Sequence, residues 1–75
     1  MVKSETERAR YRFRVKEGID CVFIVPEPAN GDDLKVLGNG FLSLDLPPGT
    51  DYKRAEEIVR FLNENITAVA YTRFL

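Results

Sequence analysis

The sequence predicts an α+β fold in which one helix packs on one face of a mixed five-stranded sheet. Segments of alternating or continuous apolar residues fill much of positions 10–46 and return in 66–75, as in β-strands. A single stretch, 52–62, has helical periodicity, and turn residues separate the segments. The elements therefore follow the order β-β-β-β-α-β, for which one helix across the sheet is the simplest two-layer packing.

The first two strands are expected to form a hairpin. In 10–16, three apolar residues alternate with four basic ones, the period-2 pattern of a strand with one apolar and one basic face. The run 19–25 is almost continuously apolar and β-branched, as expected of a strand that is partly buried on both sides. Lys16-Glu17-Gly18 between them fits a three-residue loop that ends on a glycine with positive φ.

That loop sets a register in which Val15 lies opposite Ile19. The apolar side chains of the first strand then share the core face with Cys21 and Phe23. Val22 and Ile24 fall on the other face, beside the arginines.

A second hairpin is expected after the turn-rich loop 26–33. Its strands are 34–37 and 41–46, joined by Gly38-Asn39-Gly40. A three-residue loop pairs Val36 with Leu42, which matches apolar with apolar positions.

A helix follows the strand-breaking Pro47-Pro48-Gly49, with Thr50 or Asp51 as its N-cap. Its apolar stripe consists of Tyr52, Ala55, Ile58, Val59 and Leu62. Phe61 lies off this stripe. The chain returns as a final strand, 66–75, which a right-handed crossover would place parallel to the fourth.

Residues 1–9 are polar with mixed charge, and we expect a flexible N-terminal tail there and a single domain over 10–75. The N-terminus has no apolar segment typical of a secretion signal, and no stretch is long and uncharged enough to span a membrane. We therefore expect a cytoplasmic location.

The composition argues against an enzyme or a metal protein. The chain has no histidine and one cysteine, which removes the usual general base and the common zinc ligands. Cys21 is expected to be buried and inert. Glu27, Asp32 and Asp33 lack the spacing of a calcium loop. The glycine-rich stretches do not match a phosphate-binding motif. We expect no catalytic residue, cofactor or metal.

Charge is unevenly distributed along the chain. The formal net charge is −1, yet residues 1–16 hold six basic and two acidic side chains, while residues 17–51 hold seven acidic and one basic. Arg10, Arg12 and Arg14 project from one face of the first strand at a spacing that suits a phosphate backbone. Binding of nucleic acid through these arginines is one interpretation, although no aromatic side chain shares their face. The alternative is that acidic neighbours neutralise them.

The sequence favours a protein-interaction or assembly module that self-associates, and we expect a homodimer. One helix cannot cover both faces of the sheet, and small domains without disulfides or metals often gain stability by oligomerisation. The predicted interaction surface consists of Arg10, Arg12, Arg14, Val22, Ile24 and Phe61. Against this stands the possibility that the face is simply half exposed, as in many antiparallel sheets.

Overall fold

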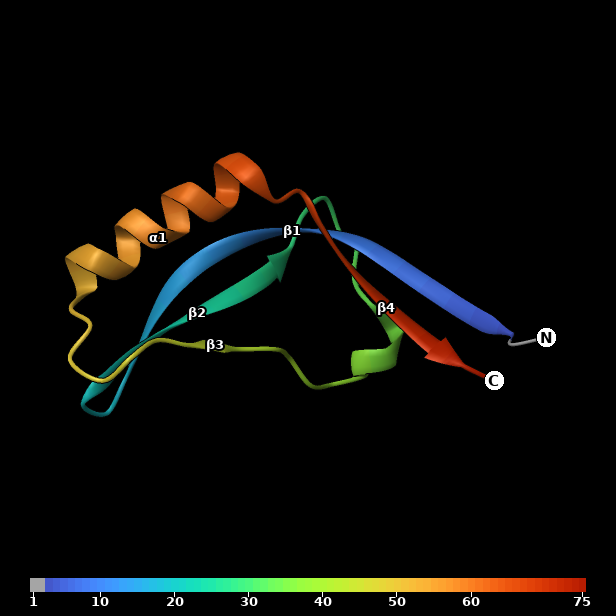
Figure 1. The fold of residues 1–75 in the computed structure, drawn as a ribbon, viewed down its shortest axis with the longest axis horizontal. Helices are drawn as coiled ribbons and strands as arrows, with labels where there is room; N and C mark the ends of the chain where they lie inside the picture. Colours follow the sequence, from blue (N-terminus) through green and yellow to red (C-terminus); the bar gives the residue numbers. More distant parts are fainter. Residues whose placement is uncertain (1–2) are drawn as a thin grey trace.

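The structure is a computed structural model that describes residues 3–75 and has one helix and a four-stranded antiparallel sheet (Figure 1). The strands are β1 (Ser4–Gly18), β2 (Cys21–Pro28), β3 (Leu44–Asp45) and β4 (Ala68–Phe74), in the spatial order β3-β2-β1-β4. The helix α1 (Tyr52–Asn65) packs against β1 and β2. The α+β class is confirmed, whereas the prediction of a mixed, five-stranded sheet is wrong.

β1 is longer than its apolar alternation indicates. It begins at Ser4, where the sequence predicts a tail, and its residues 4–10 pair with β4. Cross-strand contacts explain this pairing, since Arg73 Nη2 lies 2.8 Å from Glu5 Oε2 and the Thr6 and Thr72 hydroxyls are 2.9 Å apart. Met1 and Val2, the start of the predicted tail, lie outside the described residues.

The first hairpin forms, but in a different register. Gly18 pairs with Cys21 and Val15 with Ile24, so the loop is Ile19-Asp20, with Asp20 rather than Gly18 at positive φ (59°). The change of register moves each β2 side chain to the face opposite the predicted one. Ile24 therefore enters the core at 1% exposure, and Cys21 is exposed rather than buried.

The second hairpin does not form. Residues 35–37 form a single turn of 3₁₀ helix, η1 (Lys35–Leu37), and only Leu44–Asp45 of the next segment is a strand, paired with β2. The cause lies in β1: the two carboxylate oxygens of Glu7 accept the backbone N–H groups of Lys35 and Val36 at 3.1 and 3.0 Å. Those groups cannot then join a ladder.

The helix begins as predicted, because the Asp51 side chain accepts the N–H of Arg54 at 2.8 Å. Ala55 is buried, and the stripe continues through the half-buried Ile58, Val59 and Leu62. The strand that follows is antiparallel to β1 rather than parallel to a fourth strand. Only two residues of the predicted fourth strand, Leu44 and Asp45, form a strand, which is too short to pair with β4. The N-terminal half of β1 offers β4 a longer edge instead.

The main apolar cluster joins Ala9 and Tyr11 of β1 to Leu34, with Leu37 and Val69 packed around them. The molecule is elongated, 46 × 23 × 23 Å. Residues 4–9 of β1 and the strand β4 form a two-stranded ribbon, here called the arm, which projects away from α1 (Figure 1). No helix of the described residues is long and apolar enough to cross a membrane.

Candidate interaction surface

The arginines of β1 lie beside acidic side chains. Arg10 Nε is 3.5 Å from Asp32 Oδ2, and Arg14 Nη1 is 3.3 Å from Glu27 Oε2. Glu27 also accepts from Lys16 Nζ at 3.2 Å. The hydrogen bonds from Lys16 and then Arg14 lower the pKa of Glu27. Much of the basic face is therefore neutralised locally, by Asp32 and Glu27.

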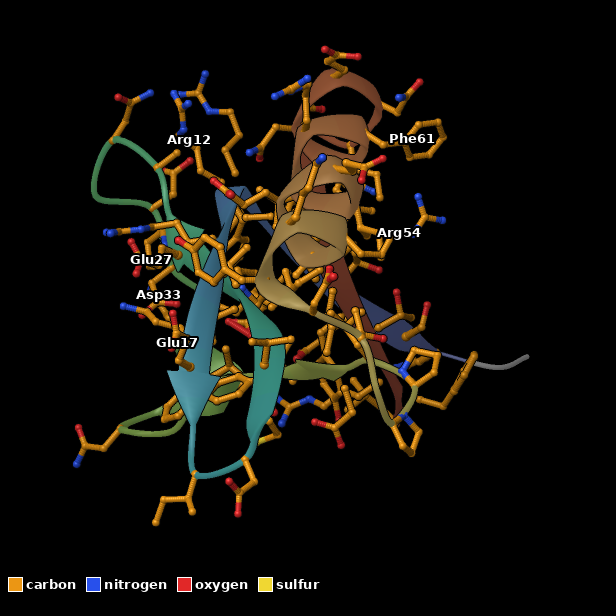
Figure 2. The ribbon with its side chains drawn as sticks, turned by 90° about the vertical axis from the view of Figure 1, so that its left-hand side faces the viewer. Arg12, Glu17, Glu27, Asp33, Arg54 and Phe61 are labelled. Atoms are coloured by element: carbon orange, nitrogen blue, oxygen red, sulfur yellow. The ribbon has the colours of Figure 1, made fainter. Side chains whose placement is uncertain are left out.

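The six residues of the predicted surface do not come together. Ile24 is buried and Val22 half-buried, and the observed register puts both on the face opposite the arginines. Phe61 is 64% exposed, but it points away from Arg12 on the other side of α1 (Figure 2).

Arg12 borders a groove of about 480 Å³ between β1 and α1. Tyr52, Glu56, Arg60 and Asn63 line its helix side. The groove carries charges of both signs, so its lining does not select an anion or a cation by net charge.

Each of the three acidic side chains at the end of β2 and in the loop after it has its own partner. Asp33 accepts the Tyr11 hydroxyl at 2.7 Å and the N–H of Leu34 at 2.8 Å, while Asp32 and Glu27 pair with Arg10 and Arg14. Among residues 3–75, no three histidine, cysteine or acidic side chains lie close enough to hold one metal ion.

The arm exposes apolar side chains that the sequence patterns do not predict. Tyr71, 42% exposed, and Phe74, 75% exposed, lie on opposite faces of β4, and Leu75, directly after the strand, is 66% exposed. The sequence holds one signal for the pairing of the arm: Glu5 complements the single charge of the last strand, Arg73.

One exposed edge of β1 is capped by the helix. Beyond Arg10, β4 no longer covers β1, and the Asn63 side chain takes its place. Asn63 Oδ1 accepts the Phe13 N–H at 2.8 Å, and its Nδ2 donates to the Phe13 carbonyl at 3.1 Å. The amide thus satisfies both backbone groups that a neighbouring strand would otherwise bind.

The outer edge of β2 is protected by proline. Because the backbone groups of Phe13 point away from β2, those of its partner Pro26 point to the outer edge of the sheet. Pro28 follows two residues later with the same orientation. Neither residue has an N–H to donate, so this edge is a poor template for another strand.

The outer edge of β4 has neither device. β4 is the last strand in the sheet order, contains no proline, and has Arg73 as its only charged residue. No hydrogen bond joins its outer side to another part of residues 3–75.

Comparisons with models of protein families, with curated proteins and with solved structures find no match to this chain.

Proposed function

We propose that this chain is a small non-enzymatic interaction or assembly module that works as a homo-oligomer, in its simplest form a two-fold dimer. The observation that carries the proposal is the accessible surface of 5996 Å². A compact monomer of this mass exposes about 4,700 Å², so the chain exposes roughly 1,300 Å² more than expected. Each partner in an interface of standard size buries about 800 Å².

The shape supports the same proposal. The radius of gyration is 14.3 Å, against about 11 Å for a compact domain of this length. Large apolar side chains are exposed at several places, including Phe41 at 70% and Phe74 at 75%. A chain that leaves this much apolar surface in water gains stability when a second copy covers part of it.

Sedimentation equilibrium or light scattering at micromolar concentration tests the proposal directly. We expect a mass of twice 8.6 kDa. A particle that stays at 8.6 kDa over the whole accessible concentration range would overturn the proposal.

Nucleic-acid binding through Arg10, Arg12 and Arg14 remains the second proposal. The ion pairs of Arg10 with Asp32 and of Arg14 with Glu27 reduce the positive potential available to phosphates, so we rank this proposal lower. It requires retention on immobilised single- or double-stranded DNA at low ionic strength, with loss of retention as salt rises. Free passage through such columns at low salt would reject it.

We also propose a cytoplasmic setting. The thiol of Cys21 is exposed and unpaired, and a reducing compartment keeps such thiols from forming disulfides between molecules.

A further inference from the structure

We propose that two copies of the chain associate edge to edge, with β4 of one copy antiparallel to β4 of the other and the two-fold axis at Tyr71. This inference rests on the proposed self-association and assigns it a surface and a register. The partner is a second copy, and the product is one continuous sheet in which both arms meet.

The backbone of β4 already points half of its groups outward. Leu75 N–H donates to the Lys3 carbonyl at 2.9 Å and Tyr11 N–H to the Thr67 carbonyl at 3.3 Å, which fixes the alternation of the ladder between β1 and β4. Odd-numbered residues of β4 therefore bond to β1. The N–H and C=O groups of the even-numbered ones face the open edge: Ala68, Ala70, Thr72 and Phe74.

An antiparallel pair of β4 strands centred on Tyr71 uses all four of these residues. Ala68 then lies opposite Phe74 of the second copy, and Ala70 opposite Thr72. Tyr71 faces its own equivalent in a non-hydrogen-bonded pair, where side chains approach most closely. Arg73 lies opposite Val69 of the second copy and keeps its ion pair with Glu5, so no like charges meet across the interface.

The other edges argue for this one. Asn63 occupies the exposed edge of β1, and Pro26 and Pro28 interrupt the part of β2 that β3 leaves unpaired. β3, the edge strand at the other end of the sheet, is only two residues long. β4 is a seven-residue edge strand without these devices, so its unpaired N–H and C=O groups offer a template for another strand. Pairing also covers Phe74 and Tyr71, two of the exposed aromatic side chains, and the excess of exposed surface is large enough for an interface of standard size.

Disulfide trapping tests the register. In a Cys21→Ser background, Tyr71→Cys places two thiols opposite one another with Cα atoms about 4.5 Å apart, within reach of a disulfide. We expect nearly complete covalent dimer under mild oxidation. Arg73→Cys is the matched control, because it lies on the same face but about 14 Å from its equivalent in this register, and it should stay largely monomeric on a denaturing gel.

Ala70→Pro tests the edge itself. Proline there removes only an outward N–H and sits acceptably at the edge of an isolated copy, but it blocks the incoming strand. We expect unchanged circular dichroism and a halved mass.

The outcomes separate the two proposals. A wild-type dimer that is trapped at position 73 but not at 71, or that persists in folded Ala70→Pro, overturns edge pairing through β4 centred on Tyr71 and leaves self-association standing. A wild-type monomer overturns both proposals. If Ala70→Pro does not fold, the trapping at positions 71 and 73 decides.

Discussion

A buried tyrosine hydroxyl connects β1 to the loop before η1. The Tyr11 side chain is 5% exposed, its hydroxyl donates to Asp33 at 2.7 Å, and it accepts the N–H of Leu34 at 3.1 Å. Burial, and then the hydrogen bond to Asp33, raise the pKa of this phenol above its usual 10.0. The folded state therefore holds the phenol proton more tightly than the unfolded chain does.

Tyr11→Phe is expected to lower the free energy of unfolding by about 1 kcal/mol at neutral pH, since Leu34 N–H keeps Asp33 as an acceptor. The contribution of the raised pKa is complete below pH 10.0 and is lost as the pH rises through the folded-state value. Urea unfolding at neutral and strongly alkaline pH should therefore show a wild-type advantage that shrinks above pH 10.0. A gap that is constant with pH would contradict this account of Tyr11.

Single residues also explain where sequence analysis failed in the first hairpin. The sequence predicts both strands, but the preference of glycine for positive φ favours a loop at Lys16-Glu17-Gly18. Gly18 has no positive φ but lies in the closing pair of the hairpin, where a Cβ would lie 3.0 Å from Cys21 Sγ and a larger residue would require that exposed side chain to shift. Asp20 takes the positive φ instead, as aspartate sometimes does. Residue composition does not distinguish a loop at 16–18 from a loop at 19–20. The position of the loop nevertheless sets the register of the hairpin, and the observed register places Ile24 in the core rather than on the surface.

At the scale of elements, the Asn63 side chain acts in place of a strand. It connects the last turn of α1 to both backbone groups of Phe13. Asn63→Ala is expected to lower the free energy of unfolding by about 1–3 kcal/mol, because it leaves two partly buried backbone groups without partners. The amide proton of Phe13 should also exchange faster with solvent in the variant.

Asn65→Ala is the control for this prediction. Asn65 lies two residues further along the same helix, and its exposed side chain donates only to the Phe61 carbonyl, at 2.7 Å. Its replacement should change stability by less than about 0.5 kcal/mol. Equal losses in the two variants would show that helix content, rather than the capped edge of β1, explains the effect.

The long-range pairing of elements was the least predictable feature. The helix and its Asp51 cap follow from local spacing, and the structure confirms them. Whether 34–37 is a strand depends on Glu7, some 28 positions earlier, whose carboxylate binds the Lys35 N–H. The partner of the last strand likewise depends on the polar start of β1. Neither contact leaves a local pattern in hydrophobicity, so a second hairpin was the natural but wrong expectation.

At the scale of the whole molecule, the sequence predicts self-association through six residues that the structure does not bring onto one face. A short chain can build only a small core whatever its register, so the argument that a second copy adds stability does not depend on how β1 and β2 pair. The location of the surface depends on which side chains face outward, and the register moved Val22 and Ile24 inward, away from the arginines. What the structure adds is an arm with an unprotected edge.

A dimer formed through the arginines of β1 and a dimer formed through the edge of β4 would respond differently to salt. A dimer held by arginines against acidic side chains weakens as salt screens the charges. A dimer held by backbone hydrogen bonds and apolar contacts along β4 has no ion pair between the copies, and high salt should leave its mass unchanged. Because the dimer is linked to folding by mass action, the melting temperature should rise with protein concentration at low and high salt alike. Differential scanning calorimetry over a wide concentration range at two salt concentrations measures both effects. A melting temperature that rises with concentration only at low salt would assign the interface to the arginines instead of β4.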